Sequence, residues 1–162
     1  MDEHTALTEA ELDQVVTWNV VRVARFLGQR LSERLAAQEL HPVQFGVLAQ
    51  LDIAGAVSQA DLARAVHLRP QSVAPLLDGL ERRGLLARTG DRVRGRRNPV
   101  EITDAGRAVL RAAWAIATSS NDLGDAGLSA AESSELNGLL LKVVDASRGA
   151  FDDESAWDWR EH

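Results

Sequence analysis

Nine arginines lie between residues 64 and 97, and their type and close spacing suit contact with phosphate groups. Against them stand three acidic residues, so this stretch has a net charge of +6. The other residues carry nine basic and 21 acidic side chains, a net charge of −12. A polyanion would be attracted to this one segment and repelled elsewhere, which favours nucleic acid as the partner. A solvated charged face is the alternative that charge alone leaves open.

Four of these arginines crowd into a loop between two segments of strand character, residues 85–88 and 100–102. Contact with phosphates or with a minor groove needs the reach of arginines on a protruding, glycine-bearing loop, whereas packing does not. We therefore expect a β-hairpin, or wing, that contacts nucleic acid. The wing residues expected to make this contact are Arg88, Arg92, Arg94, Arg96 and Arg97.

Two short helices are expected directly before the wing. Residues 58–61 form a capping box that opens the first, and Pro70 favours the start of the second. The second helix would bury Val73, Leu76, Leu77 and Leu80. Short polar side chains near the start of its opposite face can approach base edges in a major groove. The helix residues expected to read bases are Arg69, Gln71, Ser72 and Ala74.

The flanking segments have the pattern of long amphipathic helices. Apolar residues recur at steps of three and four from Leu12 to Leu35 behind a capping box at residues 8–11, which predicts one helix of about 25 to 30 residues. A small lobe cannot cover so long a helix, so we expect its apolar stripe to continue into a partner subunit. Thr103 caps a later helix, and residues 129–132 form a further capping box before the last one.

The predicted organisation is mainly α. Residues 8–40 and 103–149 form a helical dimerisation lobe, residues 41–102 a winged helix-turn-helix DNA-binding lobe, and residues 150–162 an acidic tail. The tail contains Trp157 and Trp159, which we interpret as packing anchors, with a role in binding a ligand or partner as the alternative.

Several classes of function find no support in the composition. The chain has no cysteine, so disulfides, thiolate metal sites and cysteine redox switches are excluded. Its four histidines lie far apart, and we expect neither a metal nor a cofactor. It has no phosphate-binding glycine loop and no nucleophile elbow, which argues against an enzyme. An acidic N-terminus and the lack of an 18-residue apolar run predict a cytoplasmic protein.

Two phrases give the chain a family resemblance. Leu80–Leu86 reads Leu-Glu-Arg-Arg-Gly-Leu-Leu, and Thr103–Arg107 reads Thr-Asp-Ala-Gly-Arg. In their helical context they resemble the MarR family of transcriptional regulators over roughly residues 12–147. The resemblance implies an obligate homodimer of six helices per subunit plus a two- or three-stranded β-wing, dimerised through the first, fifth and sixth helices. The chain departs from the family at Arg94, commonly an aspartate, and at Pro75, often polar or basic.

The resemblance also implies a ligand site. Many members bind small aromatic acids or drugs in a cleft between the two lobes, which releases them from DNA. An arginine there could pair with a carboxylate and aromatic side chains could stack on a ring. The alternative is that the aromatics belong to the core and that the arginine makes an intramolecular pair. The matching positions in this sequence are Trp18, Arg22, His41, Phe45 and Trp114.

The sequence thus predicts a homodimeric repressor that binds a pseudo-palindromic operator in double-stranded DNA and is released by a small aromatic or phenolic ligand. Its half-sites should lie about 10 bp apart, one turn of the duplex. Two other functions remain open. A non-specific architectural protein would use the same arginines without reading bases, and a winged-helix protein-interaction module would not need them for DNA at all.

Overall fold

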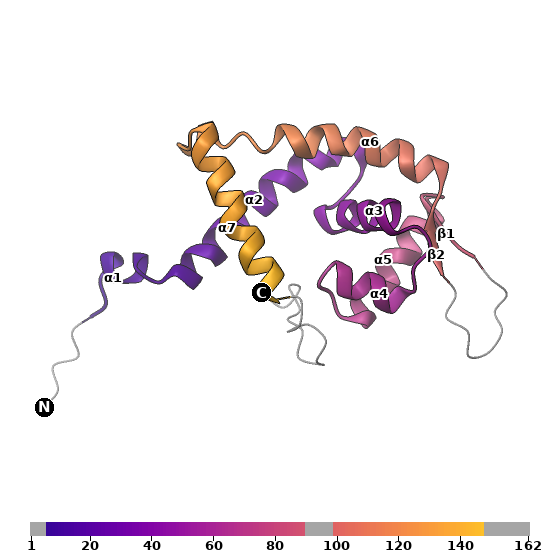
Figure 1. Cartoon of the computed structure of the whole chain (residues 1–162), viewed down its shortest axis with the longest axis horizontal. Helices are drawn as coiled ribbons and strands as arrows, with labels where there is room; N and C mark the ends of the chain where they lie inside the picture. The colour runs from indigo at the N-terminus through magenta and orange to yellow at the C-terminus, as the bar shows by residue number, and fades with distance from the viewer. Residues whose placement is uncertain (1–5, 90–98, 148–162) are drawn as a thin grey trace, which may run out of the picture.

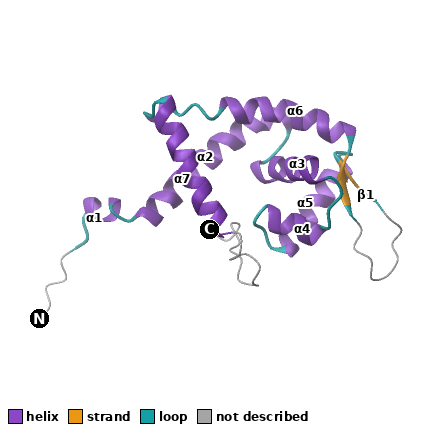
Figure 2. Cartoon of the chain, in the orientation of Figure 1, coloured by secondary structure: helices purple, strands orange, loops and turns teal. Residues whose placement is uncertain are grey.

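Helices make up most of the described chain, which comprises residues 6–89 and 99–147 of this computed structural model. A small antiparallel sheet lies at one edge of the molecule (Figure 1; Figure 2). The elements are α1 (Glu9–Asp13), α2 (Val16–Leu35), the 3₁₀ helix η1 (Ala36–Gln38), α3 (Pro42–Ala54), α4 (Gln59–Ala65), α5 (Pro70–Arg82), β1 (Leu86–Arg88), β2 (Val100–Ile102), α6 (Asp104–Ser119), the 3₁₀ helix η2 (Gly124–Ala126) and α7 (Ala130–Ser147). This mainly helical architecture confirms the expected fold class.

The expectation of one continuous first helix is wrong, because the segment is divided into α1 and α2. Thr8 caps α1 as predicted, but the helix ends at Asp13, and Val15 is extended with φ −83° and ψ 96°. Two side chains of α2 stabilise this break. Asn19 Nδ2 donates to the Asp13 carbonyl at 2.7 Å, and Arg22 Nη1 donates to Asp13 Oδ1 at 2.8 Å. Helix α1 therefore projects at the far end of α2 (Figure 1).

The other predicted helix starts are confirmed by their caps. His41 precedes Pro42 as the N-cap of α3. The Thr103 hydroxyl accepts a hydrogen bond from Gly106 N at 3.0 Å at the start of α6. The Ser129 hydroxyl accepts one from Glu132 N at 3.3 Å before α7. Because each cap satisfies an amide that the first turn of a helix leaves unpaired, these short motifs determine where the helices begin.

The hydrophobic core lies between α3, α4, α5, α6 and the sheet. Helix α2 contributes only its last residue, Leu35, to the buried set, and among the described residues α1 and α7 contribute none. Most apolar residues of α2 and α7 consequently remain exposed on the surface. The buried core residues are Leu35, Leu40, Val47, Leu48, Leu51, Leu62, Ala63, Val73, Leu77, Leu80, Leu85, Leu86, Val100, Ile102, Leu110 and Ala113.

Helix α6 starts in direct contact with the turn before β1. A Cβ atom added to Gly106 would lie 2.0 Å from the Leu85 carbonyl oxygen, so only glycine allows this approach. The Thr103 hydroxyl donates to the carbonyl of Gly84 at 2.6 Å, and Gly84 has a φ of 70°, in the left-handed region. The start of α6 is thereby fixed to the root of the wing.

Two further contacts fix the rest of α6. Arg107 Nε lies 3.2 Å from Asp52 Oδ1 of α3. Near the other end, Arg34 of α2 donates to the Ser120 hydroxyl at 3.2 Å. Helix α6 thus joins the sheet, α3 and α2, as its course across the molecule in Figure 1 illustrates.

Candidate nucleic-acid interface

Helices α4 and α5 pack against each other across a tight turn, as the sequence predicts. The Ser58 hydroxyl accepts a hydrogen bond from Asp61 N at 3.1 Å and so caps α4. The turn then passes through His67, which has a φ of 54°, and α5 begins at Pro70. Gln59 Nε2 also lies 3.5 Å from the Pro70 carbonyl oxygen. The geometry is that of a helix-turn-helix, with α5 in the place of the recognition helix.

The four helix residues expected to read bases do not all lie on the outer surface. Gln71 is exposed, whereas Arg69 and Ala74 are half-buried. Ser72 is only 6% exposed, so the expectation that it lies on the outer face is wrong. The physical reason is its helical phase. Ser72 precedes the buried Val73 directly and lies four residues before Leu76, on the edge of α5 that packs towards the core.

Pro75 lies inside α5 rather than in its first turn, because the helix starts at Pro70 and not at Ser72. A proline here has no N–H to donate to the carbonyl of Gln71, one turn back. The side chain of Pro75 is exposed. The recognition helix therefore has a missing backbone hydrogen bond within its solvent-facing half.

Arg88, at the end of β1, binds two carboxylates of α5. Its Nη2 lies 2.6 Å from Asp78 Oδ1, and its Nη1 forms an ion pair with Glu81. Partial burial of the guanidinium works in the opposite direction, but the hydrogen bond to Asp78 and the charge of Glu81 raise the pKa of Arg88 above its ordinary value. The sequence reasoning missed these two acids. Their spacing of three residues, on one helix face ahead of a strand arginine, was the available signal.

The wing forms the expected hairpin root. Leu86 pairs with Ile102 and Arg88 with Val100 in an antiparallel register. Val57, which precedes α4, adds a single bridge to Val100, with N–O distances of 3.1 and 2.8 Å. The sheet therefore has two strands plus one bridge, within the two or three strands expected. The tip arginines Arg92, Arg94, Arg96 and Arg97 lie outside the described residues.

The five residues expected to bind a ligand are only partly brought together. The rings of Phe45 and Trp114 have centroids 6.1 Å apart and planes tilted by 32°. Trp114 is 56% exposed, which leaves much of its ring accessible. Trp18 is 38% exposed, near the start of α2. Arg22 forms the ion pair with Asp13 described above, and His41 caps α3 through its Nδ1 atom, 3.4 Å from Val43 N.

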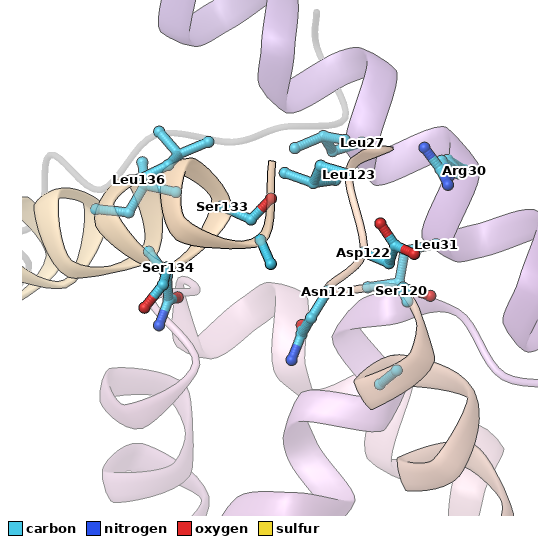
Figure 3. A pocket seen from close by; sticks show the side chains of 14 residues that line it. Leu27, Arg30, Leu31, Ser120, Asn121, Asp122, Leu123, Ser133, Ser134 and Leu136 are labelled. Carbon is cyan, nitrogen blue, oxygen red and sulfur yellow. The ribbon is translucent and has the colours of Figure 1, made fainter. Parts of the chain in front are cut away.

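A pocket of about 810 Å³ lies elsewhere, between α2, the end of α6, the linker that follows it and α7 (Figure 3). None of the five expected residues lines it. Arg30 stands at one wall, with its side chain 17% exposed and its Nη2 atom 2.5 Å from Asp125 Oδ2. The lining residues are Leu27, Arg30, Leu31, Ala117, Ser120, Asn121, Asp122, Leu123, Ala130, Ser133, Ser134, Leu136, Asn137 and Leu140.

Within residues 6–89 and 99–147, no group of three or more histidine, aspartate or glutamate side chains is arranged to hold a metal ion. No helix in these ranges is both long and apolar enough to cross a membrane.

Comparisons with known proteins agree with this geometry. A family model described as MarR family matches residues 38–97, from η1 into the wing. The HTH-type transcriptional repressor Rv2887 of Mycobacterium tuberculosis is 29% identical over 131 residues, which covers 81% of this chain and 94% of the repressor.

Solved structures extend the similarity to the fold. A probable transcriptional regulator from Pseudomonas aeruginosa is 31% identical with a TM-score of 0.66, covering 82% of this chain and 98% of that one. The transcriptional repressor CouR, bound to a 23-mer DNA duplex, is 27% identical with a TM-score of 0.75, covering 86% of this chain and 99% of that one. The helix-turn-helix, the hairpin root and these similarities together show that the chain belongs to the MarR family of winged-helix transcriptional regulators.

Proposed function

We propose that this regulator is a homodimeric repressor that binds a pseudo-palindromic DNA operator and leaves it when a small aromatic acid binds. The observation that carries the proposal is the helix-turn-helix of α4 and α5, which exposes Gln71 in the first turn of α5, with the β1–β2 hairpin following the other end of that helix (Figure 1). The similarity to CouR in its complex with DNA, and to the repressor Rv2887, supports a role in repression. Such a protein would act on the chromosome in the cytoplasm.

In this proposal the start of α5 enters the major groove. Gln71 is exposed there and has the amide that suits bidentate contact with adenine. Arg69, the N-cap of α5, and Ala74 flank it. The arginines of the wing tip contact phosphates or the adjacent minor groove. Arg88 stabilises the position of α5 against β1 and does not contact DNA, because its guanidinium is already bound by Asp78 and Glu81.

The dimer would form through the apolar faces that the single chain leaves uncovered. Val16, Val20 and Phe26 of α2 are 73%, 51% and 57% exposed, and Val143 of α7 is 68% exposed. Exposed apolar area of this extent, on two neighbouring helices, marks an interface. The pocket of Figure 3 lies between the same two helices, and Leu140 belongs to both its lining and the exposed face of α7. We therefore assign this pocket to side chains of a second copy.

The ligand would bind beside Phe45 and Trp114. CouR has been solved with p-coumaroyl-CoA, a ligand with a phenolic ring. In this chain the exposed ring of Trp114 offers a stacking surface next to Phe45, and His41 begins the helix that carries Phe45. We propose that Trp18 and Arg22, one turn apart on α2, complete the site, with Arg22 exchanging Asp13 for the carboxylate of the ligand.

Selection of bound sequences from a genomic DNA pool tests the proposal. The purified protein is mixed with fragments at about physiological salt, and bound DNA is sequenced. We expect an inverted repeat with half-sites about 10 bp apart, bound at least about 10³-fold more tightly than random DNA. Retained DNA without a motif would support an architectural protein instead. Loss of all retention would favour a protein-interaction module.

Addition of aromatic acids to the selected complex tests the release step. We expect a phenolic acid to free the DNA and to quench the fluorescence of Trp114. A Trp114→Phe variant, which keeps an aromatic ring, should keep the release and lose the part of the quenching that comes from Trp114. Release without any change at Trp114 would place the ligand elsewhere.

A further inference from the structure

Arg83, the residue that ends the recognition helix, reaches back to the corner between α2 and α3. Its Nη1 atom donates to the carbonyl oxygen of Glu39 at 2.6 Å, and its Nη2 atom donates to the carbonyl oxygen of Gln38 at 3.2 Å. The Glu39 carboxylate lies 3.6 Å from the same Nη2 atom. One planar guanidinium thus spans two backbone acceptors and one charge, which lysine could not match with its single ammonium.

The corner that Arg83 contacts has a special backbone conformation. Glu39 has a φ of 52° and a ψ of 35°, the left-handed conformation in which helices often end. Its amide bonds to the Ala36 carbonyl at 2.9 Å, and that of Leu40 bonds to the Leu35 carbonyl at 3.3 Å. The carbonyls of Gln38 and Glu39 lie beyond these bonds, at the electronegative end of the helix. A cation placed there is favoured both as a hydrogen-bond donor and as a charge.

The contact joins two elements with different tasks. Helix α2 carries the apolar face assigned to the dimer, and it ends at this corner through η1. Helix α5 carries the base-reading surface, and its far end is Arg83. Its start is fixed to α4, and Arg88 fixes its side to β1. Arg83 connects the end of α5 to the corner that directly follows the helix assigned to dimerisation.

We propose that Arg83 is a positioning residue that sets the angle of the recognition helix relative to α2, and thereby the match between the paired recognition helices and the half-site spacing of the operator. This inference rests on the proposed function. It assigns Arg83 no contact with DNA. The Arg83 contact affects only sequence-specific binding, because only a correctly spaced operator needs both recognition helices at a defined angle.

The neighbouring Arg82 provides a matched control. It is exposed in the last turn of the same helix and carries the same charge, and among the described residues it forms no bond to the α2–α3 corner. Arg83→Ala and Arg82→Ala therefore remove equal charge, but only the first removes the contact. Arg83→Lys keeps the charge and loses the planar fork, and Arg82→Lys is its control.

The first measurement compares the affinities of these variants for the selected operator and for a scrambled duplex. We expect Arg83→Ala to bind the operator at least about fivefold more weakly than Arg82→Ala does, as for a typical coupling between sites. On the scrambled duplex the two variants should agree within about twofold, because they have lost the same charge. Operators with one base pair added or removed between half-sites should be discriminated less sharply by Arg83→Ala. Equal behaviour of the two variants on all duplexes would overturn the inference.

A second measurement needs neither DNA nor a dimer. Since the chain has no cysteine, spin labels can be attached to Glu33→Cys on α2 and Gln71→Cys on α5 alone. Diluting labelled with unlabelled protein isolates the distance within one chain. Arg83→Ala should broaden or shift this distance, and Arg82→Ala should not. An unchanged distribution would overturn the inference, even if the protein proves not to recognise an operator.

Folding is monitored by thermal unfolding of every variant. If Arg83→Ala does not fold, the two lysine variants replace the alanine pair in both measurements. Arg83→Lys should then show the weaker operator binding and the broader distance distribution, and Arg82→Lys should match the parent protein. Identical results for the two lysine variants would contradict the proposal.

Discussion

At the scale of single residues, the arginines of this protein differ in what binds them. The sequence predicted the arginine cluster but not the role of each arginine. Each charge can be read from the sequence directly, whereas the groups that bind it lie elsewhere in the chain. Arg88 is bound by Asp78 and Glu81, ten and seven residues earlier in the chain. Arg83 is bound by backbone carbonyls more than 40 residues away. A carbonyl leaves no signature in a sequence, so a contact of that kind could not be predicted.

Arg88→Ala should lower stability rather than the number of phosphate contacts. The pair is partly exposed, at 27% for the arginine, so we expect a loss of about 1 kcal/mol in the free energy of unfolding. The dependence of DNA affinity on salt should keep its slope. Arg96→Ala, at the wing tip, should lower that slope by about one and leave stability unchanged. Denaturant unfolding and a salt titration distinguish the two. If Arg88→Ala lowered the slope of the salt dependence and left stability unchanged, Arg88 would be a DNA-contacting residue after all.

Gly106→Ala should be among the most destabilising small changes in the protein. The new methyl group would meet the Leu85 carbonyl oxygen at 2.0 Å and Ile102 Cγ1 at 2.8 Å. Moving backbone to relieve this overlap costs about 1–3 kcal/mol or more. Gly46→Ala is the matched control, because Gly46 lies in a helix with nothing within 4 Å of the added atom. It should gain about 0.5–1 kcal/mol. Equal melting temperatures for the two variants would contradict the close approach of α6 to the turn.

At the scale of elements, helix starts were predictable and helix interiors were not. Thr103 and Ser129 each mark a helix start, because the hydroxyl of each accepts a hydrogen bond from the amide three positions later. The break at Asp13 has no proline or glycine to mark it. It depends on Asn19 and Arg22, which bond to Asp13 from six and nine residues further on. The spacing of apolar residues continues unchanged on both sides of the break, which is why one long helix was expected.

Pro75→Ala should stabilise the recognition helix. Alanine would restore the missing backbone donor within α5 and has the highest helix propensity. Part of this gain is offset, because proline also restricts the unfolded chain, so we expect a net gain of about 1–2 kcal/mol. Thermal unfolding measures it, and amide exchange should slow around residues 71–79. A lower melting temperature would show that α5 depends on the local geometry that Pro75 imposes.

At the scale of the whole molecule, α2 and α7 expose apolar residues that the proposed dimer would cover. The core of the chain lies between α3, α4, α5, α6 and the sheet, and α7 places no described residue in it. The sequence pointed to this from the length of the first apolar stripe alone. The location of the ligand could not be predicted in the same way, because the positions that match the family include Arg22, which is paired to Asp13.

Val143→Asp should dissociate the dimer without harming the fold of the single chain. Val143 is 68% exposed, so the charge is tolerated in the monomer but would be buried without a partner in the dimer. Light scattering should give about the 17.6 kDa of one chain. Ala131→Asp, exposed in the first turn of α7 where an acid is favoured, should remain dimeric. Operator binding should fall with the dimer, and a dimeric Val143→Asp protein would place the interface elsewhere.

Helix α6 has a mechanical consequence for such a dimer. Its 16 residues form a rod about 24 Å long. One end is fixed to the wing root through Thr103 and Gly106, and the other lies against α2 through Ser120 and Arg34. A tilt of about 5° about one end of a rod of this length displaces the other end by about 2 Å. A small rotation between the subunits of the proposed dimer would thus tilt α6 and move the root of the wing. This coupling would act through α6, independently of the contact that Arg83 makes with the α2–α3 corner.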